Sequence, residues 1–162
     1  MPQLLTLISR TVVLIAHAVW VGGFTFYSTA VLWVLDDELG TFDAGRLITR
    51  RVTDWMNAAG VATLALWWGL TWIERRAKPR LPRRIRLGLI LASTLLLGFL
   101  IVAHLILDQH LDTKGRPGFY AMHSVYLIAA TIQWVANLLL IPASLWVWRN
   151  DSKQGLLTTG PL

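Results

Sequence analysis

Hydrophobic residues gather in four long stretches without charged side chains, and short polar segments separate them. The stretches cover residues 11–35, 55–73, 87–107 and 119–148. Each has roughly the 20 residues that an α-helix needs to cross the hydrocarbon core of a bilayer. The pattern predicts an all-α integral membrane four-helix bundle, with one domain over residues 1–149 and a mobile cytoplasmic tail over residues 150–162.

The segment between the second and third stretches predicts the orientation. Seven of the fifteen basic residues lie in residues 75–86, called here the basic segment, which holds no acidic residue. The positive-inside rule places this segment in the cytoplasm, and with four spans both termini follow (N-in/C-in). We expect the basic segment to contact anionic lipid. Aromatic residues do not interleave with it, so the net charge of +6 does not indicate nucleic acid binding.

Tryptophans mark the ends and the interior of the predicted helices. Trp33 and Trp55 fall at outer ends, and Trp72, Trp146 and Trp148 fall at inner ends. This is the distribution of an aromatic belt at the two membrane interfaces. The deeper tryptophans, which indicate packing or stacking on a ligand, are Trp20, Trp67, Trp68 and Trp134.

Polar and aromatic side chains recur at helical spacing and therefore share one face of each predicted helix. Because polar groups are costly against lipid, these faces are expected to look into the bundle. In the first two helices the faces are His17, Trp20, Phe24 and Tyr27, then Asn57, Gly60, Leu64 and Thr71. In the last two they are Ser93, Leu97, Leu100 and His104, then His123, Tyr126, Ala130, Trp134 and Asn137, with Gln133 at the margin.

Two of the four histidines are expected at the same depth. His104 precedes the outer end of the third helix and His123 follows the outer start of the fourth. His17 lies about 25 Å from the outer end of the first helix, at a rise of 1.5 Å per residue. A hydrogen bond from His17 to Asn137, a carbonyl or water is as consistent with that depth as ligation.

Two kinds of cofactor suit this arrangement, and hydrogen bonding to water, headgroups or loop carbonyls is the alternative to both. Imidazoles from facing helices could ligate b-type haem, with aromatic rings against the macrocycle. The candidate cofactor-binding residues are His17, His104, His123, Tyr27, Tyr126, Trp20 and Trp134. A zinc or copper ion could instead be held at the outer surface. The candidate metal ligands are His104, His123, Asp108 and His110.

The residues that are missing narrow the function further. The chain has no cysteine, which excludes disulfides, thiolate ligands and covalent c-type haem attachment. None of the four stretches contains an acidic residue, which argues against a proton pump or a cation-coupled transporter. The glycine motifs of nucleotide-binding loops and the serine motif of hydrolases are also missing from the sequence.

Residues 17–23 read H-A-V-W-V-G-G. This segment resembles the H-x-x-W-x-G-G signature of small bacterial membrane families, namely copper-resistance D-type proteins and HemJ-type protoporphyrinogen oxidases. Residues 44–47 (A-G-R-L) and 119–123 (F-Y-A-M-H) resemble the uncharacterised four-helix DUF4149-like group. The HemJ-type resemblance implies that His17 binds haem, and the copper-resistance resemblance implies copper handling. Together with the hydrophobic stretches, these resemblances predict a place in the bacterial inner (cytoplasmic) membrane.

The sequence therefore predicts an integral membrane protein that binds haem b or a transition metal through histidines. Its role would be redox chemistry, electron transfer or cofactor handling. The alternative is an accessory subunit without its own catalytic site, packed in a homo-oligomer or in a larger respiratory or photosynthetic membrane complex through its tryptophans and small-residue faces.

Overall fold

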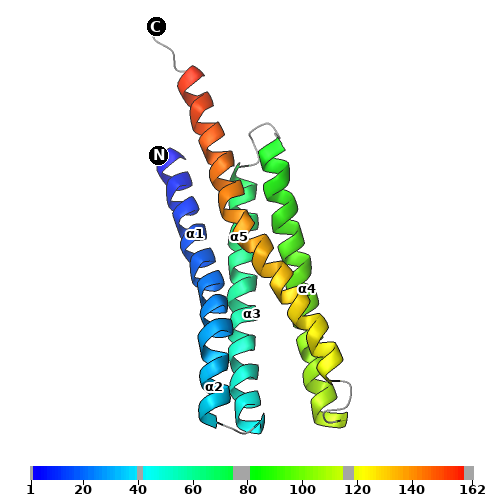
Figure 1. Ribbon diagram of the computed structural model, residues 1–162. Helices are drawn as coiled ribbons and strands as arrows, with labels where there is room; N and C mark the ends of the chain where they lie inside the picture. Colours follow the sequence, from blue (N-terminus) through cyan, green and yellow to red (C-terminus); the bar gives the residue numbers. More distant parts are fainter. Residues whose placement is uncertain (1, 40–41, 75–80, 115–118, 159–162) are drawn as a thin grey trace. The chain divides into compact units, whose positions relative to one another are not determined.

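The computed structural model describes residues 2–39, 42–74, 81–114 and 119–158, and all of these residues are helical. They form four long helices (Figure 1). The first is continuous and consists of α1 (Pro2–Phe26), the π-helix η1 (Tyr27–Val31) and α2 (Leu32–Leu39). The others are α3 (Phe42–Ile73), α4 (Leu81–Lys114) and α5 (Phe119–Thr158). The predicted all-α class with four helices is confirmed.

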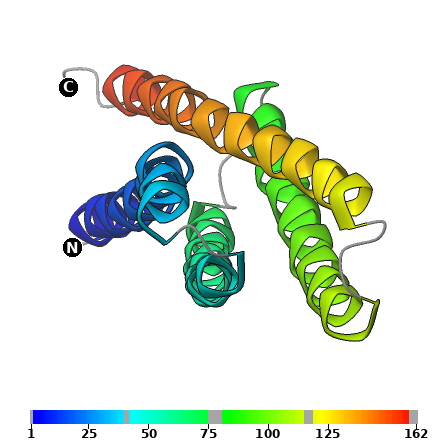
Figure 2. The same ribbon diagram turned by 60° about the horizontal axis from the view of Figure 1, so that its bottom comes forward.

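The chain divides into two compact units, where the sequence predicts a single domain. One is Met1–Glu74 and the other is Arg75–Leu162. In the first unit, here the N-terminal pair, the α1–η1–α2 helix lies antiparallel to α3 (Figure 1). In the second, the C-terminal pair, α4 lies antiparallel to α5, and a second view shows the same two pairings (Figure 2). Each unit is thus a helical hairpin with its own packing.

The helices extend beyond most of the predicted boundaries. α3 begins at Phe42, so residues 42–54, predicted as part of a loop, are helical. α4 covers residues 81–114, and therefore part of the basic segment and His110 lie on a helix. α5 continues to Thr158 and includes the first residues of the predicted tail. Charged residues stop a membrane span without stopping a helix, which explains these differences.

A π-helical turn interrupts the first helix at Tyr27–Val31. Two hydroxyl groups within this turn bond to carbonyls one turn back: Ser28 Oγ donates to Phe24 O at 2.8 Å, and Thr29 Oγ1 to Thr25 O at 2.7 Å. Such bonds compete with the backbone ladder and are a recognised cause of local helix distortion. The backbone N–H of Leu32 then reaches back to Tyr27 O, the bond that defines the wider turn.

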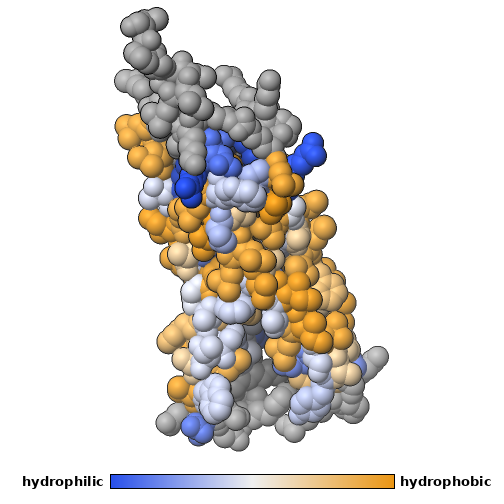
Figure 3. Space-filling view, turned by 45° about the horizontal axis from the view of Figure 1, so that its top comes forward, coloured by the Kyte–Doolittle hydropathy of each residue, from blue (hydrophilic) through white to orange (hydrophobic). Residues whose placement is uncertain are grey.

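Three helical stretches are long and apolar enough to cross a membrane: Leu4–Val34, Leu81–Leu111 and Phe119–Asp151. α3, which contains the predicted span 55–73, is not among them. Four tryptophans and an asparagine make that stretch less apolar than the other three. On the face shown in Figure 3, apolar side chains cover most of the described surface and hydrophilic ones gather toward the ends.

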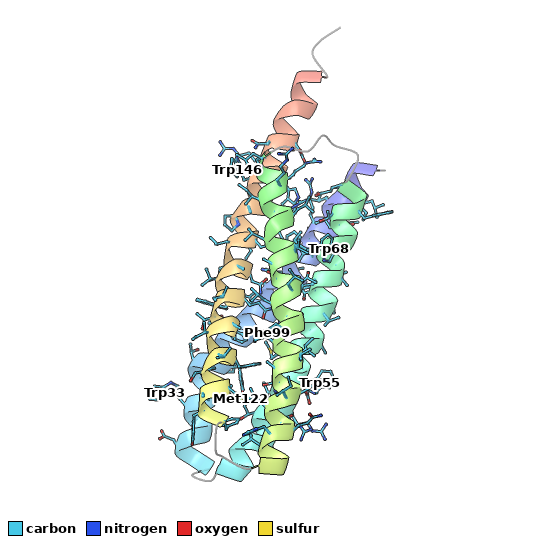
Figure 4. The ribbon with its side chains drawn as sticks, turned by 90° about the vertical axis from the view of Figure 1, so that its right-hand side faces the viewer. Trp33, Trp55, Trp68, Phe99, Met122 and Trp146 are labelled. Atoms are coloured by element: carbon cyan, nitrogen blue, oxygen red, sulfur yellow. The ribbon has the colours of Figure 1, made fainter. Side chains whose placement is uncertain are left out.

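Most of the tryptophans predicted for the interfaces are exposed. Trp33 and Trp55 lie near the end of the N-terminal pair at which α2 is followed by α3, and Trp68 lies nearer the other end (Figure 4). Trp33, Trp55 and Trp72 are largely exposed. Trp148 departs from the prediction because its side chain is buried.

The predicted inward faces are buried in part. His17, Trp20 and Leu64 are buried in the N-terminal pair, and Ser93 and Asn137 in the C-terminal pair. The main core residues of the two pairs are Val13, Leu70, Ile90, Leu97, Leu100, Ala130, Leu140 and Val147.

Candidate functional site

The C-terminal pair brings His104 and His123 to one aromatic cluster near the end at which α5 begins. The His123 ring stacks on Tyr126, with centroids 6.3 Å apart and planes 11° apart. It also stacks on Phe119, with centroids 5.2 Å apart and planes 17° apart. His104 reaches the same Tyr126 from α4, with centroids 6.5 Å apart. The two histidines that the sequence places at one level therefore share a neighbour.

Helical spacing on α5 and helix packing explain how the cluster forms. Phe119, His123 and Tyr126 follow each other at intervals of four and three residues, so their rings lie on one face. Leu97, Leu100 and His104 on α4 form the complementary face, in which both leucines are buried.

Asp108 lies one helical turn after His104, and its Oδ2 is 3.7 Å from His104 Nε2. The side chains of both residues are 13% exposed, so this ion-pair distance lies in a largely desolvated place. A hydrogen bond would require the atoms to approach to about 3 Å. Histidines that ligate metals commonly donate their second ring N–H to a carboxylate, which orients the ring. Asp108 is placed to orient His104 in this way.

The four candidate ligands of a zinc or copper ion do not gather. Among the described residues, which include His104, Asp108, His110 and His123, no three histidine or acidic side chains are grouped so that they could hold a metal ion. His110 lies on α4 beyond Asp108 and is partly exposed. Of the four candidate ligands, His104 and His123 share the contact with Tyr126, and Asp108 lies beside His104.

The N-terminal pair places His17 in a different environment. The residue is 0% exposed, and its Nδ1 accepts a hydrogen bond of 3.1 Å from the indole Nε1–H of Trp67 on α3. Trp67, also 0% exposed, meets the imidazole edge-on, with centroids 5.7 Å apart. Trp20 packs edge-on from within α1, at 6.2 Å. Trp20 and Trp67 thus surround the imidazole of His17.

The remaining candidates are Tyr27 in the N-terminal pair and Trp134 in the C-terminal pair. The hydroxyl of Tyr27, at the start of η1, faces Thr49 and Thr53 of α3. Trp134 is half-buried on α5. Its neighbour in sequence, Gln133, is buried and donates from Nε2 to Ser93 O at 3.4 Å. Trp134 lies eight residues after Tyr126 on α5, about 12 Å along the helix.

Two ion pairs were not predicted from the sequence. Arg10 Nε of α1 contacts Glu74 Oε1, which follows α3, at 2.8 Å, and Arg83 Nη2 of α4 contacts Asp151 Oδ2 of α5 at 2.8 Å. A signal for the first was present, because Arg10 and Glu74 border two hydrophobic stretches at the same predicted depth and carry opposite charges. Asp151 lies in the region predicted as a tail, so the second had no such signal.

Comparison with known proteins adds no identification: no protein family model, curated protein or solved structure matches this chain.

Proposed function

We propose that this protein is an integral membrane protein that binds b-type haem through His104 and His123, for electron transfer, redox chemistry or cofactor handling. The observation that carries the proposal is the convergence of one histidine from α4 and one from α5 on Tyr126. Haem, when bound, supplies a one-electron iron couple. The protein would hold the haem through the two histidines, and its aromatic side chains would exclude water from it.

The number of donors favours haem over zinc or copper. A structural zinc site takes four protein ligands and a catalytic zinc site usually takes three. Haem iron already has four ring nitrogens and takes one or two axial ligands from the protein. Two histidines near each other, without a third donor grouped with them in the described part of the chain, match the demand of haem.

The surroundings of the pair also suit a flat aromatic cofactor. Phe119 and Tyr126 stack on His123, and Tyr126 is in ring contact with both imidazoles. Asp108 would orient His104 by accepting its Nε2–H, which leaves Nδ1 as the donor to iron.

The protein would lie in the bacterial inner membrane, with both termini in the cytoplasm. Three candidate spanning helices support membrane insertion, and the basic segment supports the orientation. Arg83 and Arg86 belong to the first turns of α4, where Arg83 pairs with Asp151. Anionic lipid headgroups would meet the exposed part of this basic surface, such as Arg84.

Absorption spectra of the protein purified in mild detergent test the proposal. We expect a Soret band, with sharp α and β bands after reduction. H104A and H123A should each lose most of the bound haem, because each removes one of the two histidines that would hold it. H110A, on the same helix as His104 but outside the ring cluster, is the matched control and should keep full haem.

Two results would overturn the proposal. Retention of full haem by both H104A and H123A would remove the pair as the site. A colourless, metal-free protein with intact helicity would remove the cofactor. If that colourless protein also purified with stoichiometric membrane partners, the accessory-subunit alternative would replace haem binding.

A further inference from the structure

The H-x-x-W-x-G-G segment, residues 17–23 of α1, packs against one short part of α3. That part runs from Met56 to Trp67, and each of the motif's fixed residues except Gly22 meets it. His17 bonds to Trp67, and Trp20 lies against Gly60. A Cβ built on Gly23 would lie 3.5 Å from Met56 Sδ, at ordinary contact distance. The motif thus coincides with a packing surface within the N-terminal pair.

The hydrogen bond from Trp67 decides which nitrogen of His17 carries a proton. An indole N–H can only donate, so the Nδ1 that receives it must offer a lone pair. The imidazole is therefore neutral, and its proton is on Nε2. A neutral imidazole has one lone pair, and Trp67 already uses it. If Nε2 ligated iron, the proton would have to move to Nδ1. The Nδ1–H of His17 would then point at the Nε1–H of Trp67, and the hydrogen bond would be lost.

The other contacts show why the helices approach closely at this level. A side chain at position 60 would collide with Trp20, because a Cβ there would be 2.6 Å from Trp20 Cζ2. One turn further along α3, Thr63 Oγ1 donates to Ala16 O at 3.4 Å. Because position 60 is glycine, the ring of Trp20 can pack directly against the backbone of α3. The hydrogen bonds of Thr63 and Trp67 fix the register of α1 on α3.

We infer that the H-x-x-W-x-G-G segment is a helix-docking element, in which His17 is the hydrogen-bond acceptor that positions α1 on α3. His17 is a positioning residue and not a haem ligand. This assignment departs from the role that the HemJ-type resemblance implies for the residue. It stands on contacts within the N-terminal pair alone, so it does not depend on haem binding by His104 and His123.

Nitrogen NMR of the protein in lipid bilayers, labelled with ¹⁵N-histidine, tests the tautomer directly. The His17 signals are identified by their loss in H17Q. We expect an unprotonated Nδ1 and a protonated Nε2, and a change in the Nδ1 signal in W67F, which keeps the ring but lacks the N–H. W68F, altered at the next residue, should leave the His17 signals unchanged. A protonated Nδ1, or no response to W67F, would overturn the inference.

A double-mutant cycle on the unfolding midpoint provides a second test. A role of His17 as haem ligand would not couple its contribution to stability with that of Trp67. We expect H17A and W67F each to lower the midpoint of unfolding in detergent, and the double variant to fall by less than the sum of the two shifts. H17Q, whose amide oxygen can accept from Trp67, should recover part of the loss. Strictly additive shifts would contradict the proposed bond.

Haem content separates this inference from the proposed function. If wild-type protein binds haem, H17Q should keep it in full, whereas loss of haem in H17Q with retention in W67F would make His17 a ligand and overturn the inference. If wild-type protein binds no haem, the proposed function fails, and the NMR signals and the double-mutant cycle still decide the role of His17.

Discussion

The histidines of the two helix pairs differ in burial and in hydrogen-bonding partners. In the N-terminal pair, His17 is fully buried and its Nδ1 is engaged by Trp67. In the C-terminal pair, His104 and His123 are partly exposed and meet aromatic rings and a carboxylate. A position on a predicted inward face, which a sequence pattern can indicate, is common to all three. What separates a structural histidine from a candidate ligand is the partner of each ring nitrogen.

Depth follows the same division. His17 lies seven residues after Arg10, or about 10 Å along the helix, from the ion pair that joins α1 to the end of α3. His104 lies 21 residues after Arg83, about 31 Å from the corresponding ion pair of α4 and α5. In the N-terminal pair, His17 therefore lies in the same half of the α1–η1–α2 helix as the ion pair. The C-terminal pair has an ion pair at one end and the histidine cluster at the other.

The largest effect is expected from W67A, which removes both the hydrogen bond to His17 and a fully buried indole. Replacement of a buried tryptophan by alanine costs about 3–5 kcal/mol in protein cores. Unfolding by titration with a denaturing detergent should show a loss of that order. W72A, on the same helix but largely exposed, is the control and should change stability much less. Equal losses would mean that Trp67 has no special place in the packing.

The two ion pairs should differ in strength, although both distances are 2.8 Å. The Glu74 side chain is 5% exposed, so R10M would leave a carboxylate that water can hardly reach, at a cost of about 3 kcal/mol. The Asp151 side chain is 29% exposed, and R83M should cost about 1 kcal/mol or less. Salt should weaken the second pair more than the first. The same unfolding titration, at low and at high salt, measures the cost of each variant and its salt dependence. A larger cost for R83M than for R10M would contradict the prediction.

Periodicity was enough to predict the class, the four helices and the inward faces. Hydrophobic runs and helical spacing depend only on the sequence, and His17, Ser93 and Asn137 are buried as their spacing indicates. The ends of the helices were not predictable in this way. Residues 42–54 and 81–86 are charged enough to leave a membrane, yet their helical backbone continues.

The candidate site was predictable only in part. Counting residues from the helix ends placed His104 and His123 at one level, and both now meet Tyr126. The partner of His17 was not predictable, because the rotation of α1 against α3 decides whether Trp67 or another residue reaches Nδ1. A motif resemblance carries no information about that rotation. For this reason His17 is expected to differ in role from the histidines of the C-terminal pair.

The smallest changes in stability are expected from substitution of two glycines of α3 by alanine. G60A would place a Cβ 2.6 Å from Trp20, whose buried ring has little room to move, and should cost about 1–2 kcal/mol through overpacking. G69A meets nothing within 4 Å, and the higher helix propensity of alanine should make the protein about 0.5–1 kcal/mol more stable. The two variants make the same chemical change on one helix, so opposite signs in the unfolding titration would locate the docking surface at Gly60. Stabilisation by both would show that Trp20 does not depend on the space that Gly60 leaves, and the contact between Trp20 and Gly60 would no longer support the helix-docking element.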